Sequence, residues 1–302
     1  MIENIHKSGF VNIIGRPNVG KSTLMNALVG ERMSIITNKP QTTRHRIVGI
    51  INADDFQIVF SDTPGYIKKP SYKMQESMNK FVQGSFEDAD IILFVIDPRD
   101  TFEEDDPFLL KLIKSEAPIF LVVNKIDLLP ENEIDQLVEW WKSKIKLEKI
   151  FKISALNKIN TDQLLKGITD DLPDGEAFYP KDQLTDKPER FFVAEIIREK
   201  ILLLYGQEIP YSCEVYVQSF KETKTKHGAA ITNIGAEIFV SRKTQKPILI
   251  GKNGESIKRL GTEARKTLEE WLEQKVFLEL HVKVKENWRD DYNLLKNFGY
   301  ED

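Results

Sequence analysis

The stretch GRPNVGKST, from Gly15 to Thr23, decides the fold of the N-terminal part of this chain. It fits the pattern G-x-x-x-x-G-K-[ST], a loop whose backbone N–H groups surround phosphates. It follows the apolar run VNII and precedes helix-like sequence, so the helix N-terminus adds a favourable field for anions. Lys21 supplies a point charge near the β- and γ-phosphates, and the Ser22 hydroxyl can ligate Mg²⁺. The sequence therefore predicts a nucleotide phosphate site here.

Around this loop, short β-rich runs alternate with segments long enough for helices. The runs are GFVNIIG, IINADDFQIVFSD, IILFVID, PIFLVVN and KIFKIS. This rhythm predicts an α/β domain with a mostly parallel sheet and helices on both faces. Residues 52–55 form the exception, since Asn-Ala-Asp-Asp indicates a tight turn between two neighbouring strands. We therefore expect one antiparallel pair at the sheet edge.

Composition places the chain among ordinary globular proteins of about two domains. It has 302 residues, 41% of them hydrophobic, and a net charge of -4. That charge argues against general coating of nucleic acid but allows a local basic patch. The single cysteine, Cys213, excludes an internal disulfide and favours a core residue in a reducing compartment. The longest apolar runs are too short to span a bilayer, and no secretion signal is recognisable at the start, so we expect a cytoplasmic protein.

The segment 171–191 is rich in Pro, Asp and Gly and lacks an apolar period, which is typical of a linker. We predict a first domain at 1–175, a linker at 176–190 and a second domain at 191–302. The second domain reads as a helix, two strands, one or two helices and a final strand. Its class is therefore α+β. Two smaller features, the acidic residues 103–106 and the hairpin 221–227, are interpreted as a helix first turn and a solvated turn or RNA contact.

Two further motifs, NKID and SAL, follow predicted strands and are expected to select the nucleotide base. In NKID, Asp127 can accept hydrogen bonds from the ring N–H and exocyclic amine of guanine, and Asn124 can bond the base edge. The stem of Lys125 can cover the ring. In SAL, residues 154–156, the Ala155 N–H can face the guanine carbonyl. Adenine lacks the donor pair that Asp127 needs, which disfavours an ATP-dependent kinase using the same phosphate loop.

Between the phosphate loop and NKID lie the segments that we expect to sense the γ-phosphate. DTPG, from Asp62 to Gly65, ends a predicted strand, so Asp62 can hold Mg²⁺ through water and the Gly65 N–H can meet the γ-phosphate. The polar loop NKPQTTRHR offers a threonine to Mg²⁺. We choose Thr43, with Thr42 as the alternative. Together, GRPNVGKS, QTTR, DTPG, NKID and SAL resemble the translation-factor-related class of GTPases.

This resemblance makes the residue after DTPG informative. Ras-like GTPases carry a glutamine there, whereas this chain has Tyr66, so we expect slow intrinsic hydrolysis. In related GTPases without the glutamine, a phosphate-loop asparagine helps to hold K⁺. Asn18 occupies the matching position, so the resemblance implies a potassium-assisted mechanism. The alternative is that Asn18 only shapes the loop.

A second glycine turn, GKNG at Gly251 to Gly254, precedes a helix-like segment. G-x-x-G loops of KH modules clamp the backbone of single-stranded nucleic acid. Residues 242–266 hold eight basic side chains against two acids, within an acidic protein. The alternative is a solvated helix face after an ordinary turn. The predicted RNA-binding residues are Gly251, Lys252, Asn253, Gly254, Ser256, Lys258 and Arg259.

With the linker, the predicted helix 190–206 and the closing VKVKENWRDD, these motifs resemble the Era family over essentially the whole chain. These are bacterial GTPases with a C-terminal KH domain. The resemblance implies an α/β P-loop GTPase domain followed by an α+β type II KH domain. It also implies binding to the 3′ end of small-subunit ribosomal RNA and assistance in maturation of the small ribosomal subunit.

The candidate site residues are therefore as follows. For hydrolysis we expect Lys21, Asn18 and Thr43, and for Mg²⁺ Ser22, Thr43 and Asp62. For the nucleotide we expect Gly15, Arg16, Pro17, Asn18, Val19, Gly20, Lys21, Ser22, Thr23, Asp62, Thr63, Pro64, Gly65, Asn124, Lys125, Asp127, Ser154, Ala155 and Leu156. We expect a monomer. The alternative function is a GTP-regulated switch whose second domain binds a protein or, through anionic lipids, the inner face of the cell membrane.

Overall fold

A computed structural model describes residues 6–100, 107–224 and 228–301. Contacts within the chain divide it into two compact units. The first holds residues up to Pro70 together with Gln75–Asp186, and the second holds Ser71–Met74 and Lys187 onward. The contact boundary thus falls inside the predicted linker at 176–190. The acidic residues 103–106 and the tip of the hairpin 221–227 lie outside the described residues.

The first unit is built on a six-stranded sheet of order β2-β3-β1-β4-β5-β6. Its strands are β1 (Lys7–Ile14), β2 (Ile47–Asn52), β3 (Phe56–Asp62), β4 (Ile91–Ile96), β5 (Ile119–Val123) and β6 (Lys149–Lys152). All neighbouring pairs are parallel except β2 with β3, which are antiparallel. The predicted turn at 52–55 joins this edge pair, so that prediction is confirmed. Every residue of β4 and β5 is buried, which explains their unbroken apolar runs.

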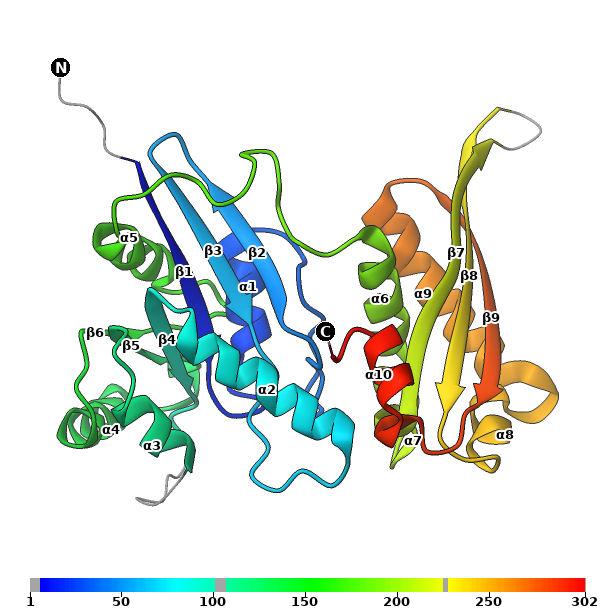
Figure 1. Ribbon diagram of the computed structural model, residues 1–302, viewed down its shortest axis with the longest axis horizontal. Coiled ribbons are helices and arrows are strands. Elements are labelled where there is room, and N and C mark those ends of the chain that lie inside the picture. Colours follow the sequence, from blue (N-terminus) through cyan, green and yellow to red (C-terminus); the bar gives the residue numbers. More distant parts are fainter. Residues whose placement is uncertain (1–5, 101–106, 225–227, 302) are drawn as a thin grey trace. The chain divides into compact units, whose positions relative to one another are not determined.

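Helices cover both faces of this sheet (Figure 1). They are α1 (Lys21–Val29), α2 (Lys73–Glu87), α3 (Pro107–Ile113), α4 (Glu131–Lys144) and α5 (Thr161–Asp171). One hydrophobic cluster joins α2, α3 and α4 to alternate residues of β4 and β5. Trp141 of α4 is fully buried there, against Phe94 of β4 at 4.9 Å between ring centroids. Because β1 and β3 are parallel neighbours, the loops after them lie together at the carboxyl edge of the sheet, where ligands bind in such folds.

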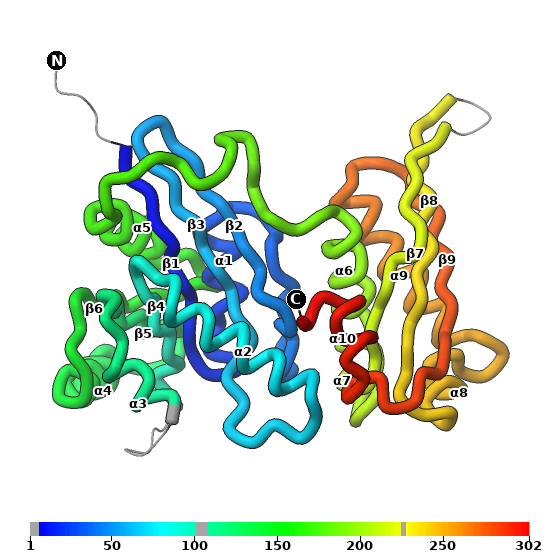
Figure 2. The backbone as a smooth tube through the Cα atoms, in the orientation of Figure 1, coloured from blue at the N-terminus to red at the C-terminus, as the bar shows by residue number. Residues whose placement is uncertain are grey.

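The segment 176–186 is hydrogen-bonded to the first unit before the second unit begins at Lys187, and its course can be followed along the tube in Figure 2. It runs along the outer edge of β2, where the Ile50 N–H donates to the Leu184 carbonyl at 2.8 Å. The Thr185 hydroxyl donates to the Val48 carbonyl at 2.6 Å. An edge strand exposes unpaired backbone groups, and this segment bonds with two of them, the Ile50 N–H and the Val48 carbonyl. Sequence analysis predicted a linker here but not its attachment to β2.

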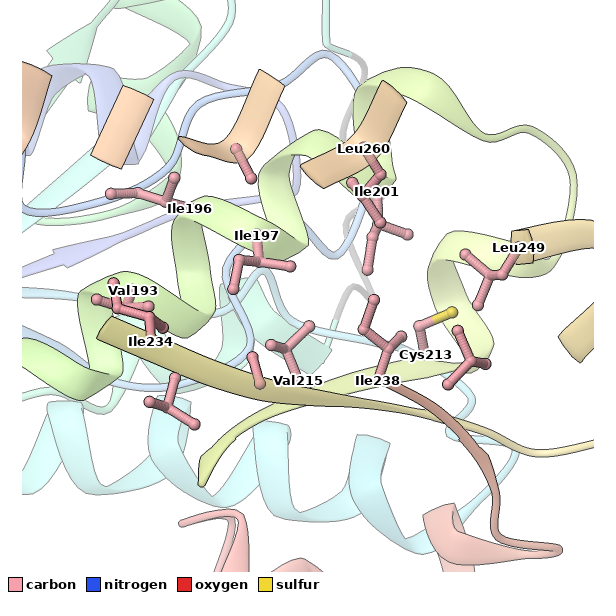
Figure 3. Packing of buried hydrophobic residues seen from close by; sticks show 14 of the residues in the cluster. Val193, Ile196, Ile197, Ile201, Cys213, Val215, Ile234, Ile238, Leu249 and Leu260 are labelled. Atoms are coloured by element: carbon pink, nitrogen blue, oxygen red, sulfur yellow. The ribbon is translucent and has the colours of Figure 1, made fainter. Parts of the chain in front are cut away.

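The second unit packs helices on one face of a three-stranded sheet of order β7-β8-β9. Its elements are α6 (Glu189–Leu204), α7 (Ile209–Ser212), β7 (Cys213–Lys224), β8 (Ala230–Val240), α8 (Gln245–Ile250), α9 (Glu255–Leu272), β9 (Lys275–Val284) and α10 (Tyr292–Asn297). β7 and β8 are antiparallel, and β8 and β9 are parallel. Figure 3 shows the core, in which α6 contributes Val193 and Ile197, and β8 contributes Ile238. Cys213 is buried in this core, as predicted.

The other face of this sheet carries a C-terminal segment that sequence analysis did not predict as structure. Trp288 and Tyr300 are buried there, and Phe298 packs against Phe239 of β8 at 5.4 Å. The Tyr300 hydroxyl donates to the Glu214 carboxylate at 2.6 Å. The segment is short and mixed in polarity, so no periodicity marks it.

Candidate nucleotide site and KH loop

The phosphate loop lies between β1 and α1, where the sequence places it. Gly20 has φ 99°, a left-handed conformation that costs glycine little. Lys21 is buried, and its ammonium group donates to the carbonyls of Gly15 and Arg16, both at 3.0 Å. Burial lowers the pKa of Lys21 to about 8, although nearby Asp62 opposes the shift. The phosphate loop itself therefore holds the Lys21 ammonium group in place.

Three oxygen-bearing side chains meet beside Lys21. Ser22 Oγ lies 2.7 Å from Asp62 Oδ2 and 2.9 Å from Thr43 Oγ1, and Thr43 Oγ1 lies 3.5 Å from the same carboxylate oxygen. They come from α1, from the end of β3 and from the loop before β2. The Thr42 hydroxyl instead donates to the Lys39 carbonyl at 2.6 Å. The geometry therefore favours Thr43 over Thr42 as the residue beside Ser22 and Asp62.

This cluster fits a small divalent cation. Hydroxyl and carboxylate oxygens are the ligands that Mg²⁺ prefers, usually with substrate phosphates completing the shell. Asp62 is fully buried, and burial raises its pKa despite Lys21 and the hydrogen bonds from Ser22 and Thr43. A bound cation would supply positive charge that favours the ionised carboxylate.

The base-reading loops are tied to the phosphate loop through Asn124. Its amide nitrogen donates to the Val19 carbonyl at 2.8 Å, and its oxygen accepts the Ala155 N–H at 2.9 Å. The Ala155 N–H that sequence analysis aimed at guanine is therefore engaged by Asn124 in this structure. Asp127 is exposed and lies on a short 3₁₀ turn that follows Lys125.

A cavity of about 430 Å³ connects these parts, a size within the range of small-molecule sites. Eleven predicted residues line it: Pro17, Asn18, Gly20, Lys21, Ser22, Thr23, Gly65, Asn124, Lys125, Asp127 and Leu156; Thr42 and Thr43 do so too. The other predicted nucleotide residues do not line it: Gly15, Arg16, Val19, Asp62, Thr63, Pro64, Ser154 and Ala155. Most of these are buried and support the lining from behind.

Sequence analysis missed part of the wall. Ile35, Ile36, Thr37, Asn38, Gln41 and Leu128 also line the cavity. All but Leu128 lie between α1 and β2, in the loop for which the sequence predicted only a threonine ligand to Mg²⁺. The signal that was available is Ile35-Ile36, an apolar pair in a polar loop. Ile36 is 46% exposed, as expected for a wall that a ligand would cover.

The DTPG glycine lies directly against the phosphate loop. A Cβ on Gly65 would come within 2.5 Å of a Pro17 ring carbon and 2.8 Å of the Pro17 backbone nitrogen. Tyr66 packs beside Phe108 of α3 at 5.9 Å, with the Lys111 ammonium 5.5 Å from the Tyr66 ring. Within the described residues, Tyr66 does not line the nucleotide cavity. Its ring is thus held in the helix layer.

The second glycine turn differs from the phosphate loop because it lies at the surface of the protein. Gly251, Asn253 and Gly254 have φ values of 74°, 52° and 78°, between α8 and α9. A Cβ on Gly251 would lie 2.2 Å from Ser256 Oγ, whereas one on Gly254 would meet nothing within 4 Å. The backbone of Gly254 is therefore open to a ligand at the N-terminus of the 18-residue helix α9.

The basic residues around this turn lie outside the core. Lys252, Asn253, Lys258 and Arg259 are exposed, while Ser256 is partly buried under Gly251. Leu260 of α9 is fully buried. The predicted RNA-binding residues therefore form one surface at the start of α9.

Comparison with known proteins gives the class. Residues 10–125 match a family model described as 50S ribosome-binding GTPase, and residues 208–289 match one described as KH domain. The chain is a GTP-hydrolysing protein with a P-loop GTPase domain and a KH domain.

Whole-chain relatives give the family. GTPase Era of Clostridium kluyveri is 44% identical over 98% of this chain and 99% of its own. A chloroplastic GTPase ERA1 of Zea mays is 46% identical over 98% of this chain and 71% of its own. The structure of a substituted Aquifex aeolicus Era bound to GDP·AlF₄⁻ matches with a TM-score of 0.91 and 39% identity, covering 98% of this chain and all of that one. The chain belongs to the Era family.

The Gly65 contact gives a prediction. In Gly65→Ala the new methyl group cannot fit against Pro17 without displacing the loop, so affinity for a non-hydrolysable GTP analogue should fall at least about tenfold. Affinity for GDP, which lacks the γ-phosphate, should fall less. Titration calorimetry with both nucleotides measures the ratio. Gly84→Ala in α2 is the matched control, because a Cβ there meets nothing within 4 Å. Equal losses for the two nucleotides would contradict a γ-phosphate role for Gly65.

Proposed function

We propose that this protein is a GTP-driven switch that binds the 3′ end of small-subunit ribosomal RNA and assists maturation of the small subunit. The observation that carries the proposal is the match to a solved Era in complex with MgGDPNP and nucleotides 1506–1542 of 16S ribosomal RNA. That match has a TM-score of 0.91 and covers 98% of this chain. The proposal gives each glycine turn its own ligand: nucleotide in the first unit and RNA backbone in the second.

Guanine selection is proposed to rest on Asp127. Its carboxylate stands exposed beside the cavity, ready to accept two N–H groups of guanine on one edge. Lys125 lines the same cavity and would lie over the ring. Asn124 would contribute chiefly by holding the phosphate loop and the SAL loop together, and less by bonding the base edge itself. Mg²⁺ would be bound by Ser22 and Thr43 and by Asp62 through water.

Hydrolysis is proposed to use Asn18 and Lys21 where other GTPases use a glutamine. The Asn18 amide nitrogen lies 3.4 Å from the Asn38 carbonyl, so a carboxamide and a loop carbonyl meet at the rim of the cavity. The Asn38 carbonyl oxygen could ligate K⁺ together with the Asn18 carboxamide oxygen, once the Asn18 side chain turns that oxygen toward the same point, and the ion would add positive charge beside the phosphates. Lys21 supplies the fixed charge and Thr43 the loop contact to Mg²⁺.

Potassium dependence is testable without any variant. Single-turnover GTP hydrolysis should be about tenfold or more faster in KCl than in NaCl of equal ionic strength, because only K⁺ would fit this site. Asn18→Ala should remove the difference while leaving GDP affinity within about threefold. Equal rates in the two salts would refute the potassium role of Asn18.

RNA binding is proposed to depend on the backbone-open loop at Gly251–Gly254. Lys252→Asp with Asn253→Asp should weaken binding to a 3′-terminal 16S fragment at least about tenfold and reduce the salt dependence, since a phosphate contact is lost. GDP affinity should not change. Lys142→Asp with Ser143→Asp on α4 makes the same change in charge on the first unit and should have little effect. Unchanged RNA binding in the loop variant would reject the proposed RNA site.

Coupling between the two ligands is proposed to pass through β2 and the segment attached to it. Thr43 lies four residues before β2, and the outer edge of β2 holds Leu184 and Thr185, just before the second unit begins at Lys187. A shift of the Thr43 loop on hydrolysis would therefore reach this segment through a short path of backbone hydrogen bonds.

The coupling has a measurable ratio. RNA affinity with a GTP analogue and with GDP should differ by about fivefold or more in the native chain. Thr185→Val removes the hydroxyl that bonds Val48 and should move this ratio toward one. Thr169→Val is the control, since the Thr169 hydroxyl donates to the Lys166 carbonyl in an exposed helix turn. A full ratio in Thr185→Val would show that coupling takes another path.

The proposed working place is the cytoplasm, as a monomer. In the part of the chain that the structure describes, no helix combines the length and apolarity needed to cross a bilayer. Contact of the basic surface around Lys252 and Arg259 with anionic lipid of the inner membrane is the alternative. Loss of vesicle binding, with RNA binding intact, in the loop variant would favour that alternative.

A further inference from the structure

The strongest unassigned group near the site is Asp97, the first residue after β4. It is 5% exposed and does not line the nucleotide cavity. One of its oxygens, Oδ2, accepts from the Lys125 ammonium at 2.9 Å and from an Arg99 guanidinium nitrogen at 2.6 Å. Its other oxygen accepts the Arg99 backbone N–H at 3.0 Å and Arg99 Nε at 2.9 Å. Burial alone would raise the pKa of Asp97, but these hydrogen bonds hold it below its usual range.

Among the residues that the structure describes, Asp97 is one of two acceptors that hold the Lys125 ammonium. The second is the carbonyl of Asn18 in the phosphate loop, at 2.6 Å. Lys125 itself is in a left-handed conformation, with φ 60°. A lysine side chain is a flexible four-carbon stem with a strongly hydrated end, so without partners it samples many positions. Acceptors on two different loops leave the stem little freedom.

Two neighbouring hydrogen bonds, here called rungs, join the NKID loop to the phosphate loop. Asn124 donates to the Val19 carbonyl and Lys125 donates to the Asn18 carbonyl, so neighbouring residues of one loop bind neighbouring carbonyls of the other. The first rung is buried and needs no further support. The second ends in a charged group at the cavity wall, where Lys125 is partly open to solvent. Asp97 supplies the carboxylate that keeps this second rung in place.

We infer that Asp97 is a positioning residue for nucleotide binding: it holds Lys125 so that the stem forms a ready wall for the guanine ring. This inference rests on the proposed guanine site. Preorganisation of this kind raises affinity by removing the cost of ordering a side chain on binding. Because GDP and GTP share the base, both should lose affinity equally when Asp97 is changed.

The experiment is a double-mutant cycle in the full chain, read by calorimetric affinity for GDP and for a GTP analogue. Asp97→Asn should weaken both nucleotides about tenfold, since an amide replaces a charge-assisted acceptor. The single-turnover rate at saturating GTP should stay within about twofold. In a Lys125→Met background, Asp97→Asn should cost less than about twofold, because the side chain through which it acts is gone.

Arg99→Met is the matched control. It removes the Arg99 guanidinium from Asp97 but leaves the Lys125 contact, so GDP affinity should change less than about twofold. Loss in Arg99→Met as large as in Asp97→Asn would overturn the inference, as would a full Asp97→Asn effect in the Lys125→Met background. If Asp97→Asn does not fold, Asp97→Glu keeps the charge and shifts it by one methylene. That variant should lose about threefold alone and nothing further with Lys125→Met; additive losses would overturn the inference.

The cycle also separates this inference from the proposed function. If Lys125→Met alone leaves GDP affinity unchanged, the proposed base site is wrong and the inference falls with it. If Lys125→Met weakens GDP but Asp97→Asn does not, the base site stands and only the role of Asp97 is rejected.

Discussion

The carboxamide of Asn124 joins the three loops on which the nucleotide pocket depends. One side chain, 2% exposed, binds the phosphate loop through Val19 and the SAL loop through Ala155. An amide can donate and accept at once, so it can join a carbonyl on one side to an N–H on the other. A carboxylate would leave the Val19 carbonyl buried without this partner, and an aliphatic residue would leave both groups so, at a cost of about 1–3 kcal/mol for each group. This link fixes the NKID and SAL loops relative to the phosphate loop.

The charged groups of the pocket are arranged on the same principle of mutual support. Lys21 and Asp62 are both buried, and each lies in the field of the other. Two carbonyls hold the ammonium, and two hydroxyls, from Ser22 and Thr43, lie beside the carboxylate. Buried charges are tolerated only when they are paired and hydrogen-bonded. The side chains that would receive a triphosphate and its cation therefore orient one another through these contacts.

The two glycine turns solve different problems with similar residues. In the first, the lysine is buried and the glycines let other protein groups approach, as Gly20 does with the Asn124 amide. In the second, Lys252 is exposed and Gly254 opens its backbone to solvent. A closed site suits one small ligand of fixed shape, whereas an open one suits a long, flexible chain that passes over the surface. Burial, more than motif, separates the two roles.

The sequence by itself determined the α/β first domain, the edge hairpin at 52–55, the α+β second domain, and most of the pocket lining. These depend on local signals: periodicity, glycine positions and short motifs placed after strands. Only the tertiary structure decided that Thr43 and not Thr42 joins Ser22 and Asp62, and that Asp97 holds Lys125. It alone showed the linker on the edge of β2 and Tyr300 beneath the KH sheet. Each of these contacts either joins residues that lie far apart in the chain or depends on the direction of a side chain within a loop. Neither property leaves a periodic trace in the sequence.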